Sequence, residues 1–297
     1  MGHNKEKGEE MSAPRTYLRR WSMLLGLALC AATAQAKSGS AHQEPLTAAQ
    51  AQSLVDRAFA AESRAALDQN RPMRYLLRKA TPRLATSKEI IETREGAVAR
   101  LVAQNGQPLN AFDEQRERQR LDGLAQSPSQ QSRRKHSADN DARMVLKILR
   151  TIPRAFLFQY EGAAIAPNGR AIQKYCFRPN PGFEPPDMET AVLKSMTGEL
   201  WIDANEERVV RIAGSLQQDT NFAWGILGKL SKGGWLVIDQ AEVANHEWRI
   251  TRVQLKMNLR ILFKTKIFDT DETMTNYAPV AAGLDYRQAI QMLRSGR

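Results

Sequence analysis

The clearest structural signal in this 297-residue sequence is the stretch GELWIDANEERVVRI, residues 198–212. Two runs rich in β-branched and aromatic residues, 198–203 and 208–212, flank the polar connection 204–207. Short apolar runs on both sides of a polar turn are typical of a β-hairpin. The sequence therefore predicts an antiparallel pair of strands here.

Further strand patterns precede and follow this hairpin. Phe156, Phe158 and Tyr160 alternate on one face, and residues 171–178 are expected to pair with them across a Pro-Asn-Gly turn. In residues 248–259 the apolar phase switches near Thr251. Because side chains alternate with period two, this switch predicts a β-bulge or a strong bend.

Helical patterns lie before the strands and between them. An apolar stripe predicts a helix over 46–67, and Asn110 is expected to cap a charged helix that ends near Ala125. The basic cluster at 133–136 is interpreted as a solvated turn before a further helix that leads to Pro153, with phosphate or lipid contact as the alternative. The remaining expected elements are extended stretches at 73–80, 87–94 and 97–104, a short helix capped by Asp187, and a terminal helix at 285–294.

Together these patterns predict an α+β fold. We expect a strongly curved antiparallel sheet, an incomplete barrel, with helices packed on one side. The expected organisation is a signal peptide at 1–36, a linker and N-terminal helix at 37–72, and a half-barrel domain at 73–297. A charged helical insertion at about 110–150 interrupts this domain.

The N-terminal segment has the three parts of a secretory signal peptide. Three arginines at 15–20 precede an apolar run at 23–32, and the small residues of 34–36 supply a cleavage site. We therefore expect an exported, periplasmic protein. A lipid anchor at Cys30 is the less favoured alternative, because Leu29 stands where a lipobox has a small residue, and Met1 and Met11 both stay open as the start.

Composition limits the partners. The formal charge of +11 gives a moderately basic surface, which suits anionic lipid head groups or simply solubility. Nucleic acid is not expected as a partner of an exported protein. No second apolar stretch is long enough to span a membrane, so we expect no transmembrane segment in the mature chain, and its oligomeric state stays open.

Residue patterns typical of catalysis are scarce. The histidines His42, His136 and His246 are not spaced as zinc ligands, and Asp203 is interpreted as an ordinary turn residue. The glycine-containing stretch at 225–231 lacks the first glycine and the Ser or Thr of a phosphate loop. We therefore expect no enzyme, no metal and no cofactor.

The segment 221–235 combines large apolar side chains with four glycines and two lysines. Such a segment can line or gate an apolar cavity, or touch a membrane through Lys229 and Lys232, or it can simply be core. Leu255 and Met257 are added from one apolar phase of the last long strands, and which phase faces inward stays open. The candidate ligand-binding residues are Phe222, Trp224, Ile226, Leu227, Leu230, Trp235, Leu255 and Met257.

The hairpin at 198–212, the stretch FAWGILG at 222–228 and the exported N-terminus resemble envelope proteins of the outer-membrane lipoprotein-sorting type. These are the LolA-like and LolB-like carrier and receptor folds. The resemblance implies an incomplete antiparallel barrel, closed on one side by helices around an apolar cavity that binds acyl chains without chemistry. The charged insertion at about 110–150 is larger than a minimal carrier of this type needs.

The expected function is therefore that of a non-enzymatic periplasmic binding protein or carrier for an acylated ligand, a lipoprotein or a lipid. The membrane surface is a second candidate partner. The alternative is a cell-envelope interaction or assembly module with a packed core and no ligand.

Overall fold

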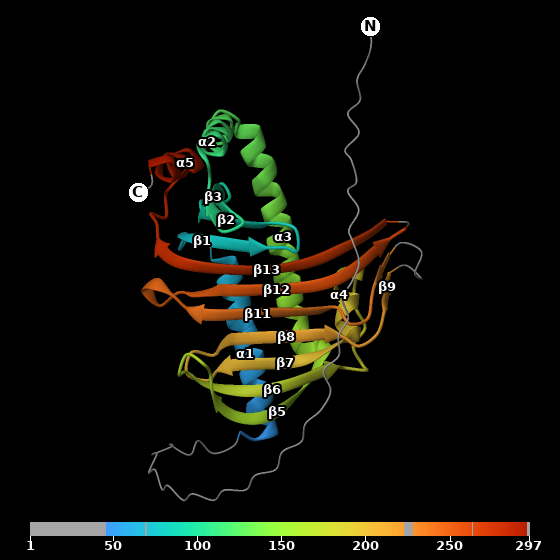
Figure 1. The fold of residues 1–297 in the computed structure, drawn as a ribbon. Helices are drawn as coiled ribbons and strands as arrows, with labels where there is room; N and C mark the ends of the chain where they lie inside the picture. Colours follow the sequence, from blue (N-terminus) through green and yellow to red (C-terminus); the bar gives the residue numbers. More distant parts are fainter. Residues whose placement is uncertain (1–45, 69, 223–227, 263, 296–297) are drawn as a thin grey trace, which may run out of the picture. The chain divides into compact units, whose positions relative to one another are not determined.

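One antiparallel sheet dominates the computed structural model, which describes residues 46–68, 70–222, 228–262 and 264–295. Its main path of strands runs β4-β3-β2-β1-β13-β12-β11-β8-β7-β6-β5, and the short β9 and β10 extend it beside β12 (Figure 1). The strand bounds are β1 (Met73–Ala80), β2 (Ala85–Ile91), β3 (Val98–Gln104), β4 (Gln107–Pro108), β5 (Phe156–Ile165), β6 (Ala171–Pro179), β7 (Met196–Asp203), β8 (Arg208–Leu216), β9 (Thr220–Phe222), β10 (Gly228–Leu230), β11 (Trp235–Glu242), β12 (Trp248–Ile261) and β13 (Lys264–Pro279). The sheet is open, with β4 and β5 as its edges, so the expected α+β fold with an incomplete barrel is confirmed.

Two long helices cross one face of this sheet, which we call its inner face (Figure 1). They are α1 (Ala48–Leu67) and α3 (Pro128–Ala155). Thr47 begins α1 with a capping box, because its hydroxyl accepts from the Gln50 amide and the Gln50 side chain accepts from the Thr47 amide. The apolar side of α1 lies on β5 to β8, where Val55, Tyr175 and Leu200 are fully buried in the main core.

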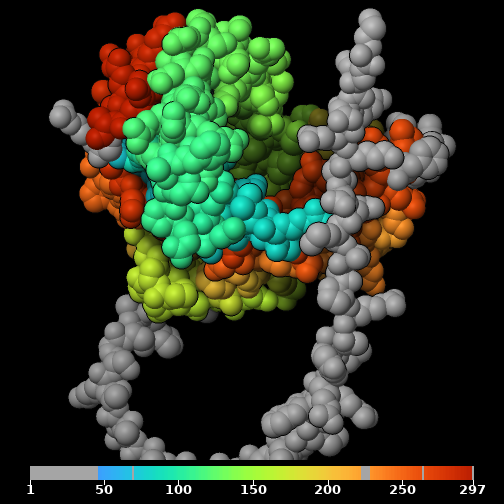
Figure 2. All heavy atoms as spheres, turned by 45° about the horizontal axis from the view of Figure 1, so that its top comes forward, coloured from blue at the N-terminus to red at the C-terminus, as the bar shows by residue number. Residues whose placement is uncertain are grey.

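A second core lies at the β2–β3 edge of the sheet. Here α2 (Ala111–Ala125) and α5 (Tyr286–Ser295) bury Leu121, Ile290 and Leu293 against Ile91 and Val98. Figure 2 shows α2, the N-terminal part of α3 and α5 together on this side of the molecule. The short helix α4 (Met188–Ala191) and the 3₁₀ turns at Val192–Ser195 and Ala244–His246 complete the described elements.

Local sequence signals account for several element ends. Asn110 accepts from the Asp113 amide at 2.9 Å and Asp187 accepts from the Thr190 amide at 3.0 Å, so both expected helix caps are confirmed. The expected bulge near Thr251 is also confirmed: Arg252 lies opposite Asp239, whereas Ile250 lies opposite Gln240.

One local prediction was wrong. Residues 133–136 do not form a turn but lie inside α3, which begins with Pro128 directly after Ser127. Lys135 pairs with Asp139 one helical turn later, at 2.7 Å. The basic run is therefore part of a continuous helix, because Pro128 provides the break that separates α2 from α3.

Among the described residues, no helix is both long and apolar enough to cross a membrane.

Candidate functional site

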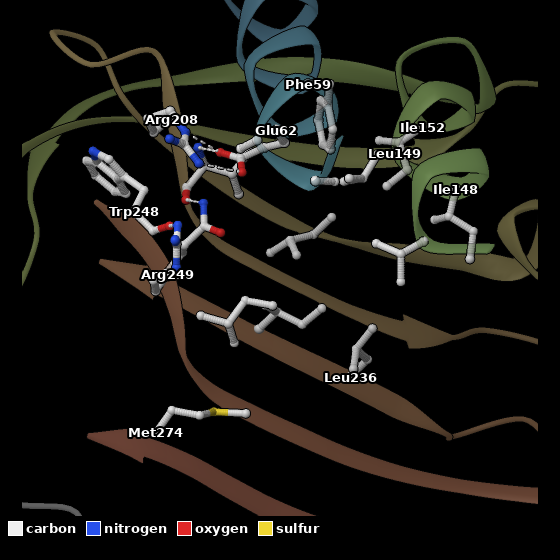
Figure 3. A pocket seen from close by; sticks show the side chains of 18 of the residues that line it. Phe59, Glu62, Ile148, Leu149, Ile152, Arg208, Leu236, Trp248, Arg249 and Met274 are labelled. Carbon is white, nitrogen blue, oxygen red and sulfur yellow. Dashed lines mark hydrogen bonds and ion pairs between the residues drawn. The ribbon is translucent and has the colours of Figure 1, made fainter. Parts of the chain in front are cut away.

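A cavity of about 820 Å³ lies between the inner face of the sheet and helices α1 and α3. Figure 3 shows Phe59 on α1 and Ile148, Leu149 and Ile152 on α3 lying across from Leu236 and Met274 on the sheet. The apolar part of the wall includes Phe59, Val145, Ile148, Leu149, Ile152, Phe156, Phe177, Val192, Leu193, Met196, Ile212, Leu230, Leu236, Ile238, Ile250, Met257 and Met274.

The repeat of two residues in a strand and of three to four residues in a helix explains which side chains form this wall. On β11, Leu236, Ile238 and Gln240 point inward because alternate residues of a strand share a face. On α3, Val145, Ile148, Leu149 and Ile152 share a stripe because residues three and four apart lie on one side of a helix. Aliphatic and thioether side chains of this kind form an adaptable, water-excluding surface.

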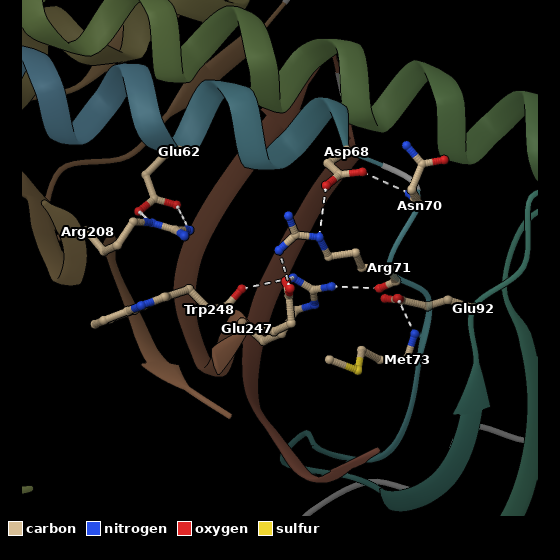
Figure 4. Close-up of polar contacts among 10 residues, drawn as sticks. Glu62, Asp68, Asn70, Arg71, Met73, Glu92, Arg208, Glu247 and Trp248 are labelled. Atoms are coloured by element: carbon tan, nitrogen blue, oxygen red, sulfur yellow. Dashed lines mark hydrogen bonds and ion pairs between the residues drawn. The ribbon is translucent and has the colours of Figure 1, made fainter. Parts of the chain in front are cut away.

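One end of the cavity is charged, and a buried ion pair stands at its centre. Both carboxylate oxygens of Glu62 accept from the Arg208 guanidinium at 2.9 Å (Figure 4). Glu62 also accepts from the Val209 amide at 3.0 Å. Arg208 also lies over the Trp248 ring, 5.5 Å from its centroid. This pair ties α1 to the start of β8.

A second group of charges lies beside Trp248 at the same end. Glu247 pairs with Arg71 and, at 3.1 Å, with Arg249, and Arg249 donates to the Arg71 carbonyl at 2.8 Å (Figure 4). The Arg71 side chain is 63% exposed, so this end of the cavity reaches solvent. A polar group of a ligand can therefore be solvated here while its apolar part lies against the wall.

Glu92 and two tyrosines complete this end. The Tyr75 and Tyr277 rings are stacked with centroids 5.0 Å apart, and Tyr277 donates to the Ile250 carbonyl at 2.6 Å. Glu92 accepts from the Met73 amide at 2.9 Å (Figure 4). Burial raises the pKa of the Glu92 carboxyl above its ordinary value, and burial together with nearby carboxylates raises the pKa of Tyr75 to about 12. Tyr75 is therefore a neutral hydroxyl at the cavity wall.

The candidate ligand-binding residues divide into three groups. Leu230 and Met257 line the cavity, and Leu255 shares the inner face with Met257 because it lies two residues before it on β12. Trp235 lies on the opposite, outer face, since the neighbouring Leu236 points inward. Phe222 ends β9 at the sheet's extension, while Trp224, Ile226 and Leu227 lie outside the described residues.

Much of the cavity comes from residues that were not among these candidates. The helical stripe from Val145 to Ile152 is visible in the sequence, but its pairing with β11 is not. The charged end joins Glu62 to Arg208, which lies 146 positions further along the chain. No local pattern predicts a contact over that separation.

Asp203 and Cys176 are the two remaining side chains whose chemistry needs an account. Asp203 accepts from the amides of Asn205 and Glu206 and pairs with Arg170 at 2.6 Å, so it shapes its turn as expected. Burial raises the pKa of the Cys176 thiol. Within the described ranges, no group of three or more His, Cys, Asp or Glu side chains is placed to hold a metal ion.

Comparison of the chain with protein-family models, curated proteins and solved structures gives no significant match.

Proposed function

We propose that this protein is an exported, non-enzymatic carrier that binds an acylated ligand, a lipid or the acyl chains of a lipoprotein, in its inner cavity. The cavity itself is the observation that carries the proposal. Its volume of about 820 Å³ lies in the range of about 300–1,000 Å³ typical of small-molecule sites. An unfilled apolar hollow of this size destabilises a fold, so a ligand that fills it offsets that cost.

The distribution of polarity supports an amphiphilic ligand. The apolar wall between α3 and β11 suits acyl chains, whereas the charged end with Arg71 and Arg249 suits a polar head group. Of the carboxylates that line the cavity, Glu62 and Asp68 pair with arginines, and Glu92 accepts from a backbone amide. Because these carboxylates already have partners in the protein, the contacts support ligand binding, and not catalysis, as the role of the site.

The alternative, an assembly module with a packed core, expects no such hollow. The signal-peptide pattern of the sequence supports export to the periplasm and therefore access to lipids and lipoproteins of the envelope.

Cavity-filling variants test the proposal. Leu236→Trp places an indole inside the cavity, and the matched control Val237→Trp places the same group on the outer face of β11. Binding of a fluorescently labelled palmitate is measured by titration, with folding checked by thermal melting. We expect saturable binding by the wild type and Val237→Trp, and at least about tenfold weaker binding by Leu236→Trp.

Ile148→Trp, on the opposite wall, gives a second test if Leu236→Trp does not fold. The proposal is overturned if folded wild-type protein shows no saturable binding, or if both Trp variants on β11 bind palmitate equally.

A further inference from the structure

The hairpin of β12 and β13 extends beyond the neighbouring strands. The last residue of β1 pairs with Asp271, and β11 begins opposite Lys256, so neither strand accompanies the hairpin to its end. In the described part of the chain, only the short β10 pairs further along, through Lys229 and Leu230 with Arg260 and Leu259. Figure 1 shows this end of the hairpin reaching past β11 and β1. We call residues 258–262 and 264–268 the hairpin end.

The hairpin end is basic and its charges are not neutralised. Arg260, Lys264 and Lys266 are exposed, and the hairpin end contains no acidic residue. None of the three forms an ion pair within the described residues, although Lys266 lies over the Phe268 ring at 4.6 Å. Closer to the centre of the sheet the pattern is different, because Arg252 pairs with Asp271 at 2.7 Å.

The hairpin end is also unusually apolar for an exposed segment. Ile261, Leu262 and Ile267 are 49%, 53% and 67% exposed. Ile267 lies opposite Asn258, and Asn258 and Ile261 have opposite parity on β12, so Ile261 and Ile267 lie on opposite faces of the two-stranded ribbon. Large aliphatic side chains therefore lie on both faces of the ribbon and do not form a single flat patch.

This combination fits a lipid bilayer better than a protein partner. A protein surface contacts one face of a ribbon, which leaves the aliphatic residues of the other face in water. The boundary between head groups and acyl chains surrounds an inserted ribbon on both faces, and lysines and arginines then reach the phosphates above. Anionic lipids complement the net positive charge of the hairpin end.

We propose that the hairpin end docks the protein on a bilayer that contains anionic lipids. Ile261, Leu262 and Ile267 enter the interfacial layer, and Arg260, Lys264 and Lys266 contact lipid phosphates. This inference goes beyond the proposed carrier function and does not depend on the occupant of the cavity.

The test is co-sedimentation of the exported protein with vesicles of phosphatidylglycerol and phosphatidylcholine. The triple variant Arg260→Gln/Lys264→Gln/Lys266→Gln removes the charges of the hairpin end. The matched control, Arg133→Gln/Arg134→Gln/Arg150→Gln, removes three exposed charges from α3 and changes the net charge equally. At about fivefold per basic side chain, the first variant should bind roughly 100-fold more weakly, and the control should bind like the wild type.

A second variant, Ile261→Ser/Ile267→Ser, tests insertion. We expect its vesicle binding to be weakened even at high salt, with an unchanged melting temperature because these side chains lie outside both cores. No vesicle binding by the wild type, or equal binding by the two charge variants, would overturn the proposal. Palmitate binding by the same variants reports separately on the cavity, so failure of one proposal is distinguishable from failure of the other.

Discussion

Glu62 contributes both to the stability of the fold and to the arrangement of the charged end of the cavity. Its side chain is 9% exposed, and both oxygens are used by Arg208 and the Val209 amide. Removing a carboxylate from such a pair leaves a guanidinium in a poorly solvated position, which costs more than the intact pair contributes. Glu62 therefore fixes both the α1–β8 contact and the position of Arg208 against Trp248 at the charged end of the cavity.

We predict that Glu62→Ala lowers the free energy of unfolding by about 3–5 kcal/mol. The matched control is Arg57→Ala on the same helix, which removes an exposed pair with Glu207 of the β7–β8 turn, at 2.7 Å. That change should cost less than about 1 kcal/mol, because water screens exposed ion pairs. Urea unfolding of the two variants checks this, and equal losses would contradict a buried, structural role for Glu62.

At this scale the sequence predicts caps and turns but not long-range partners. Asn110, Asp187 and Asp203 each accept a backbone amide two or three residues further along the chain, so these capping and turn contacts follow from local patterns. The contacts of Glu62 with Arg208 and of Arg71 with Glu247 do not, because only the folded sheet brings these partners together.

At the scale of elements, β7 and β8 approach each other unusually closely. Gly198 lies opposite Gly214, and the Phe177 ring packs over this glycine pair. A Cβ at Gly198 would lie 1.9 Å from the Ala213 carbonyl oxygen and 2.7 Å from the Phe177 ring. The glycine therefore allows the ring to contact the backbone in the main core.

We predict that Gly198→Ala destabilises the protein by about 2–3 kcal/mol, since backbone or ring must move to make room. Gly283→Ala is the control, because a Cβ there meets nothing within 4 Å, and it should change stability by less than about 0.5 kcal/mol. Thermal and urea unfolding measure both changes. A Gly198 variant as stable as the Gly283 variant would show that the close approach is not required.

Element boundaries were predictable where a chemical signal marks them. The phase switch at Thr251 gave the bulge in β12, and the hairpin at 198–212 became β7 and β8. The basic run at 133–136 was misplaced because charge alone does not distinguish a solvated helix from a turn. Which phase of β11 faces inward was also not predictable, so the sequence did not distinguish Trp235 from Leu236 as a residue of the inner face.

At the scale of the whole molecule, β12 connects three features. It begins at Trp248 beside the charged end of the cavity, contributes Met257 to the apolar wall, and ends at Ile261 in the hairpin end. The curvature of the sheet follows from strand twist and the bulges, and the cavity follows from that curvature. Its existence therefore depends on the whole sheet, and no single segment of the sequence predicts it.

Native mass spectrometry of residues 37–297, produced in a bacterial periplasm and purified without detergent, shows directly whether the cavity holds a ligand. We predict a bound phospholipid, fatty acid or acylated peptide on the wild type and on Val237→Trp, and its loss from Leu236→Trp. A clean apo mass for folded wild-type protein, even after incubation with lipids and lipopeptides, would contradict the carrier account.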